Sequence, residues 1–105
     1  MKRTEPVSLR EVLESAILQA GMDSRLAERR AVAAWPQVVG EGLAQLTAAA
    51  DVSKGVLTVV ARDAVLRHEL TMMRSALVAA LNKEAGADVV SDIRFVSSLL
   101  KPINP

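Results

Sequence analysis

The stretch that decides the fold class is residues 49–61, AADVSKGVLTVVA. Lys54 and Gly55 form a turn signal between apolar segments, and the glycine supplies the positive φ that a tight hairpin turn requires. Residues 56–61 are a continuous run of β-forming residues, which predicts a strand with both faces partly covered. Residues 48–52 are rich in alanine, and we predict them as a strand because residues 56–61 need a partner. The stretch therefore predicts a β-hairpin.

A long helix, straight or kinked, and a third strand are predicted after the hairpin. Asp63 is a typical N-cap and Gly86 a typical C-terminal stop. Between them apolar residues recur every three or four positions, as on one face of a helix: Leu66, Leu70, Met73, Leu77 and Leu81. Residues 89–96 alternate between two faces and predict a strand. Strands at both ends of one helix indicate an α+β fold, a three-stranded sheet with helices on one side.

Three helices are predicted before the hairpin. Ser8 is a good N-cap and Glu11 completes a capping box, while Gly21 is the predicted stop of this first helix. A second helix begins at Asp23 or Ser24. It kinks or stops at Trp35, because Pro36 has no N–H group to donate to the preceding turn. A short third helix then runs from Pro36 to about residue 45.

The junction between the second and third helices, residues 34–43, reads AWPQVVGEGL. A dinucleotide-binding loop needs a preceding strand and a third glycine, and both are missing here. We therefore predict that Gly40 and Gly42 allow close packing of helices. Trp35 has two interpretations, a core residue or an exposed anchor for a partner, and the sequence leaves both open.

The composition predicts one small domain. The chain has 105 residues, half of them apolar, no cysteine and a net charge of +1. We assign residues 1–98 to a single domain and residues 99–105 to an extended or disordered tail. The charged N-terminus is unlike a signal peptide, and no apolar run approaches the roughly 20 residues that span a bilayer. We expect a cytoplasmic protein.

The sequence favours binding over catalysis. His68 is the only histidine, and no motif pairs it with a nucleophile or a substrate-binding group. We interpret it as a surface residue. Scattered carboxylates without ligand spacing predict no metal site. We therefore predict no enzyme activity and no cofactor.

The basic residues form a candidate nucleic-acid interface. If they converge, they make a strip that binds phosphates: Arg25, Arg29, Arg30, Lys54, Arg62 and Arg67. The alternative is a solvated face whose charges are balanced by neighbours such as Glu28 and Glu69. A strip of this kind would bind DNA or RNA.

A set of short motifs in one order resembles the DciA family of bacterial proteins. The motifs are Trp35, Val38-Val39-Gly40, the strand Gly55–Val59, Glu69-Leu70, Leu81-Asn82 and Ile93-Arg94-Phe95. The resemblance covers about residues 8–97. It implies a KH-like α+β domain and a role in DNA replication, in which the protein binds the DnaB-type replicative helicase and promotes its loading on single-stranded DNA. Nucleic-acid-binding KH domains carry a GxxG loop between two helical segments after the hairpin, and residues 70–73 stand there without glycine.

Three hypotheses follow from the sequence. The first is a non-enzymatic adaptor for the replicative helicase, with single-stranded DNA as a second partner. The second is a KH-like module that binds DNA or RNA. The third is a self-associating scaffold, which would use Leu99-Leu100 and the outward faces of Val90 and Val96.

Overall fold

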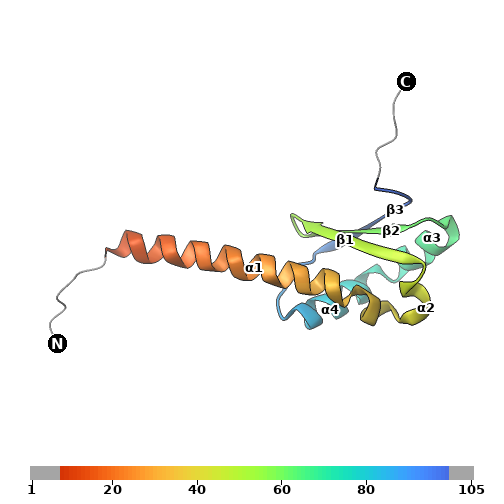
Figure 1. The fold of residues 1–105 in the computed structure, drawn as a ribbon, viewed down its shortest axis with the longest axis horizontal. Helices are drawn as coiled ribbons and strands as arrows, with labels where there is room; N and C mark the ends of the chain where they lie inside the picture. The colour runs from red at the N-terminus through yellow and green to blue at the C-terminus, as the bar shows by residue number, and fades with distance from the viewer. Residues whose placement is uncertain (1–7, 100–105) are drawn as a thin grey trace, which may run out of the picture.

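The computed structural model describes residues 8–99. They form a mixed α+β fold (Figure 1). The elements are α1 (Leu9–Val39), α2 (Glu41–Ala44), β1 (Thr47–Ser53), β2 (Val56–Ala61), α3 (Ala64–Met72), α4 (Arg74–Ala85) and β3 (Asp92–Val96). The fold class is therefore confirmed, with the order of elements that a KH-like domain was expected to have. Apart from Leu99, the predicted tail lies outside the described residues.

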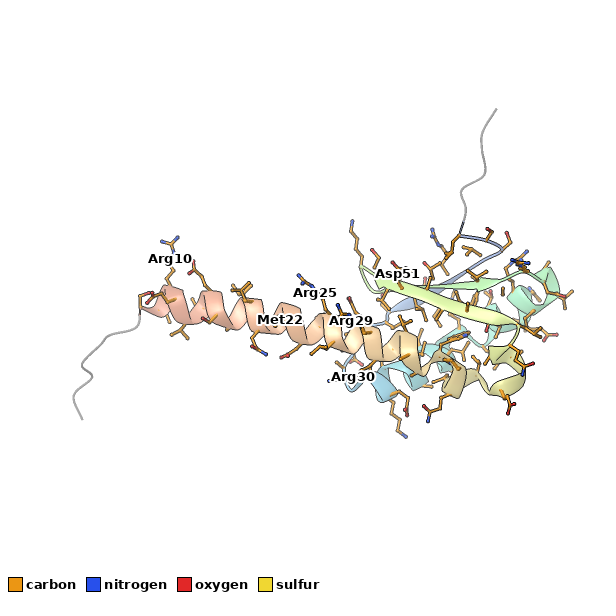
Figure 2. The ribbon with its side chains drawn as sticks, viewed as in Figure 1. Arg10, Met22, Arg25, Arg29, Arg30 and Asp51 are labelled. Atoms are coloured by element: carbon orange, nitrogen blue, oxygen red, sulfur yellow. The ribbon has the colours of Figure 1, made fainter. Side chains whose placement is uncertain are left out.

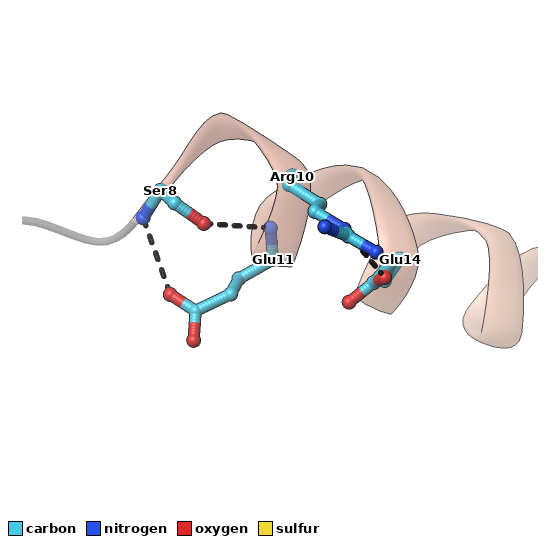
Figure 3. Close-up of polar contacts among 4 residues, drawn as sticks. All are labelled: Ser8, Arg10, Glu11 and Glu14. Carbon is cyan, nitrogen blue, oxygen red and sulfur yellow. Dashed lines mark hydrogen bonds and ion pairs between the residues drawn. The ribbon is translucent and has the colours of Figure 1, made fainter.

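Helix α1 begins as predicted. The Ser8 hydroxyl accepts a hydrogen bond from the Glu11 N–H, and the Glu11 carboxylate accepts one from the Ser8 N–H (Figure 3). One turn further on, Arg10 and Glu14 form an ion pair at 3.3 Å. The two bonds between Ser8 and Glu11 satisfy backbone N–H groups that a helix start otherwise leaves free.

The division of this region into helices was wrong. Helix α1 is 31 residues long and continues through both Gly21 and Pro36. A glycine inside a helix costs only about 1 kcal/mol relative to alanine, so it does not oblige a helix to end. Pro36 removes one hydrogen bond, but its ring is exposed while Trp35 beside it is buried. Packing of Trp35 holds this last segment of α1 in place.

Helix α1 ends at Val39, four residues later than the predicted stop at Trp35, and Gly40 is its C-cap. Gly40 has φ +90° and donates its N–H to the carbonyl of Pro36. This backbone conformation favours glycine and turns the chain into α2. The prediction of close packing was wrong, because a Cβ added at Gly40 or Gly42 would meet no atom within 4 Å.

The hairpin is confirmed. β1 and β2 are antiparallel, with Thr47 opposite Ala61 and Ser53 opposite Val56, and one irregularity between Ala49 and Asp51. Lys54 and Gly55 make the turn, with φ values of +52° and +81°. Two positive φ angles in succession are the mark of a two-residue hairpin turn that matches the twist of the strands.

The helix predicted after the hairpin is kinked, an alternative that the sequence left open. The helix breaks at Met73, whose ψ of 4° separates α3 from α4. Asp63 caps α3 through bonds from the N–H groups of Val65 and Leu66, and Gly86 ends α4 with φ +77°. β3 then pairs with β2 in parallel, which gives the sheet order β1-β2-β3.

The third strand is shorter than predicted. It begins at Asp92, because residues 89 and 90 are held by Asn82 instead of by the sheet. The Asn82 amide donates to the carbonyl of Val90 and accepts from the N–H groups of Val89 and Val90. Val90 is 3% exposed, so the expected outward orientation of this residue was wrong.

The core lies between the sheet and the helices that cover one of its faces, α1 and α4 (Figure 1). Its largest members are fully buried: Trp35, Leu57, Leu70, Leu81, Ile93 and Val59. The first buried residue of the described chain is Ala27, and residues 8–26 are all exposed. The first half of α1 thus extends beyond the folded body (Figure 1). We call residues 9–26 the arm and the remaining described residues the body.

The arm does not make α1 a membrane-spanning helix. Within residues 8–99, no helix is both long enough and apolar enough to cross a bilayer.

Candidate partner and nucleic-acid interfaces

Trp35 is a core residue in this structure. Its side chain is 1% exposed, and its ring centroid lies 6.3 Å from that of Phe95. The indole N–H donates to the Thr47 hydroxyl at 2.9 Å, and that hydroxyl donates to the carbonyl of Leu43 at 2.8 Å. The core interpretation is therefore the one that the structure supports. A partner would reach this ring only if α1 moved away from the sheet.

Two of the predicted basic residues are brought together. Arg25 and Arg29 line a groove of about 350 Å³ between α1 and β1, and Figure 2 places both on the side of α1 that faces Asp51. Arg30 lies on the opposite side of the helix (Figure 2). Glu28 and Asp51 also line the groove. The groove thus carries two carboxylates beside its two guanidinium groups, which reduces its attraction for phosphate.

The remaining basic candidates lie at two different ends of the sheet. Lys54 is in the hairpin turn, whereas Arg62 and Arg67 follow the far end of β2. A strand of this length spans roughly 20 Å. Arg67 is also engaged within the fold, since its guanidinium donates to the carbonyls of Ala61 and Arg62 at 2.7 and 2.9 Å. The six residues do not form one continuous strip.

Sequence reasoning missed a third cationic position, beside β3. Arg74 and Arg94 line a groove of about 560 Å³ together with Thr58, Thr71 and Phe95. Arg74 forms an ion pair with Asp92 at 3.2 Å, with both side chains about half exposed. Arg94 is exposed and has no ion-pair partner within residues 8–99. The alternation of side chains along β3 could have predicted the exposure of Arg94, because this residue follows buried Ile93 and must therefore point to the other face of the sheet.

The junction between α3 and α4 lies where a KH domain would carry its GxxG loop. Residues 70–73 include no glycine, and Met73 donates its N–H back to the carbonyls of Leu70 and Thr71. That N–H group is therefore used within the helix end. Close approach of a nucleic-acid backbone, which the glycines permit in KH domains, has no equivalent here.

Within residues 8–99, every charged side chain is at least partly exposed. His68 is exposed, as predicted. Within residues 8–99, no cluster of three or more histidine, cysteine or acidic residues could hold a metal ion. What the surface offers is charged grooves and, on the arm, exposed apolar side chains.

Together these features define a small α+β domain with a long amino-terminal helix and grooves lined by arginine. The family model described as "Dna[CI] antecedent, DciA" matches residues 8–95. The chain belongs to the DciA family.

Two curated relatives come from Mycolicibacterium smegmatis. They are named a UPF0232 protein and a UPF0232 protein in the recF-gyrB intergenic region, and each is 29% identical to this chain over 92 residues. The match covers 88% of this chain but 47% of each relative. The chain thus spans about half the length of the curated relatives it matches.

Most residues that carry the family resemblance have a structural task. Trp35, Leu70, Leu81 and Ile93 are buried; Asn82 holds the segment before β3, and Gly40 and Gly55 have positive φ. The charged members, Glu69 and Arg94, are exposed instead. Neither forms an ion pair within the described part of the chain. Packing does not account for these two residues.

Proposed function

We propose that this chain is a non-enzymatic adaptor in bacterial DNA replication, which binds the DnaB-type helicase in the cytoplasm and promotes its loading on single-stranded DNA. The observation that carries the proposal is membership of the DciA family across residues 8–95. The adaptor would act by binding energy alone. By binding one state of the helicase ring more tightly than the other, it would shift the ring toward a form that accepts a strand.

Glu69 and Arg94 are the contacts that we propose for the helicase. Exposed charges without an internal partner contribute little to folding, so their presence in the family pattern calls for another role. Arg94 lies in the groove beside β3, and Glu69 lines a separate groove of about 660 Å³ with Arg62 and Asp63. A partner with charges opposite to these two residues would gain specificity more than raw affinity.

The experiment is a titration of the labelled 105-residue chain with the DnaB-type helicase, in which binding is measured by fluorescence anisotropy. We expect a saturable complex at micromolar concentrations or below. Arg94→Glu and Glu69→Lys should each weaken it about tenfold or more, since each puts a like charge against the partner. Lys83→Glu, an exposed charge reversal on α4, is the matched control and should bind normally. Absence of binding by the unmodified chain at tens of micromolar would contradict the proposal.

Nucleic-acid binding is the second candidate function. The shared groove of Arg25 and Arg29 favours it, although Glu28 and Asp51 in that groove oppose it. For single strands the logarithm of affinity falls with the logarithm of salt by about 0.7 per neutralised phosphate. The variant Arg25→Glu/Arg29→Glu should therefore lower this salt slope by roughly 1.4 if both residues contact phosphates. An unchanged slope would mean that the groove does not bind the strand, and no dependence on salt would favour the adaptor alone.

A further inference from the structure

The arm presents an apolar surface that nothing in the body covers. One side of it carries large and small apolar residues at helical spacing, which we call the arm stripe: Leu9, Val12, Leu13, Ala16, Ile17 and Ala20. Leu9 and Ile17 are 73% and 70% exposed. The arm has seven of the twelve exposed large apolar residues of the described chain, four of them in the arm stripe and three outside it: Leu18, Met22 and Leu26. A concentration of this kind on a water-soluble surface marks an interaction site.

The arm stripe continues an interface that already exists within the body. Seven residues after Ala20 comes Ala27, and Ala31 and Ala34 follow at spacings of four and three. All three are buried on α1, which packs against α4 and the sheet. The same face of the helix is thus covered in the body and uncovered in the arm. Since most helical stability in proteins comes from packing of an apolar face, burial of the arm stripe against a partner would stabilise the arm.

We propose that the arm stripe is buried by the arm of a second copy of the chain, packed antiparallel. The six positions of the arm stripe are arranged symmetrically about the midpoint between Glu14 and Ser15. In this arrangement Leu9 of one copy faces Ala20 of the other, and Leu13 faces Ala16. Val12 faces Ile17, so two of the three kinds of pair join a large side chain to an alanine and the third joins two β-branched side chains. A large residue opposite a small one is how facing helix positions fill space without clashes. A two-fold axis through the midpoint generates all six contacts from one surface.

The charges of the arm are consistent with a second arm as its partner. The stripe itself has no charged residue, and the next position in its spacing is Asp23, which ends the apolar overlap at Ala20. The opposite side carries Arg10, Glu11 and Glu14 together with the exposed Leu18 and Met22, and Arg10 pairs with Glu14. A membrane surface would select a cationic polar side, and this one is slightly acidic. A second neutral stripe is the better match.

Sedimentation equilibrium of the full chain tests the association. We expect a monomer–dimer equilibrium at micromolar concentrations. Leu13→Glu should raise the dimer dissociation constant roughly tenfold or more, because it buries two uncompensated charges near the centre of the interface. Leu18→Glu is the matched control, since Leu18 is 70% exposed but lies on the other side of the helix; it should dimerise normally. A monomer at all concentrations, or a dimer that survives Leu13→Glu, would overturn the proposal.

Cysteine cross-linking tests the direction of packing, because the chain has no cysteine of its own. An oxidised mixture of the Leu9→Cys and Ala20→Cys chains should give a covalent heterodimer. Leu9→Cys alone should not cross-link, because the two copies of this residue would lie about 16 Å apart along the axis, far beyond the Cα separation of a disulfide. Efficient cross-linking of Leu9→Cys alone would establish parallel arms and overturn the antiparallel arrangement.

The two proposals can fail separately. Helicase binding is tested with variants in the body, at Glu69 and Arg94, whereas self-association is tested with variants in the arm. Leu13→Glu can be carried through the helicase titration as well. If it abolishes helicase binding while the unmodified chain sediments as a monomer, the arm stripe binds the helicase and the second-copy proposal is wrong.

Discussion

At the scale of single residues, Trp35 explains why the proline after it does not end the helix. Its ring is buried against Phe95 on β3, and its N–H reaches β1 through Thr47. Thr47 in turn donates to the carbonyl of Leu43 in α2. The Trp35 side chain therefore links the end of α1 directly to β3 and β1, and Thr47 extends this connection to α2. Any bend at Pro36 that withdrew this ring would break both of its contacts at once.

The Thr47 hydroxyl is the test of this linkage. Thr47→Val keeps the size of the side chain but leaves the indole N–H of Trp35 without its acceptor, which should lower the free energy of unfolding by about 1–3 kcal/mol. Thr47→Ser retains the hydroxyl and should lose less. Urea unfolding followed by Trp35 fluorescence measures both, since Trp35 is the only tryptophan. Equal losses for the two variants would show that the hydrogen bond is not what matters.

At the scale of elements, the hairpin turn connects two parts of the sheet. The carbonyl of Gly55 accepts bonds from the N–H and the hydroxyl of Ser91 and from the N–H of Asp92. The turn that joins β1 to β2 thus also fixes the start of β3. Two features favour glycine at position 55. Its φ is +81°, and an added Cβ would lie 2.7 Å from the Ser91 hydroxyl oxygen.

Neighbouring substitutions in this turn should have opposite effects. Gly55→Ala should destabilise the fold by about 1–2 kcal/mol, the usual cost of a left-handed conformation for a residue with a Cβ. Lys54 already bears that cost at φ +52°, so Lys54→Gly should stabilise the fold by about 0.5 kcal/mol once the entropy of glycine is subtracted. Thermal unfolding of both variants is the measurement. Loss of stability in Lys54→Gly would mean that the lysine side chain makes a contact that offsets its strain.

The elements that could be predicted from the sequence are those whose signals act locally. The capping box at Ser8, the turn at Lys54-Gly55 and the stop at Gly86 depend on nearby backbone groups, and all three are confirmed. The errors concern Gly21 and Pro36, whereas the kink that the sequence left open after the hairpin falls at Met73. At Pro36, tertiary packing outweighs a local penalty, and at Met73 the helix breaks without a local signal. Such outcomes depend on contacts that only the assembled fold provides.

At the scale of the whole molecule, the candidate site was predicted less well than the fold. Arg25 and Arg29 share a groove because they are one helical turn apart, which the sequence does reveal. The separation of Lys54 from Arg62 and Arg67 follows from the length of β2 and could have been anticipated. The groove of Arg74 and Arg94 could not, because residues 20 positions apart meet there only through the packing of α4 near β3. Sites built across elements require the tertiary structure.

The division into arm and body leads to the last prediction, the deletion of residues 1–22. The first buried residue of the described chain is Ala27 and residues 8–22 are all exposed, so we expect the deletion to remove no core residue, and Asp23 or Ser24 remains to cap the shortened helix. The free energy of unfolding should change by less than about 0.5 kcal/mol. The denaturant slope reported by Trp35 fluorescence should also stay the same, because it follows the surface that unfolding of the body exposes.

The same truncated chain separates the roles of the two parts. If the arm associates with a second copy and the body contacts the helicase, the truncation should sediment as a monomer and still bind the helicase with unchanged affinity. A loss of more than about 1 kcal/mol in stability would instead mean that the arm folds back and packs on the body. In that case the arm stripe would be buried against the body of the same chain. Leu13→Glu should then lower the free energy of unfolding of the untruncated chain by a similar amount.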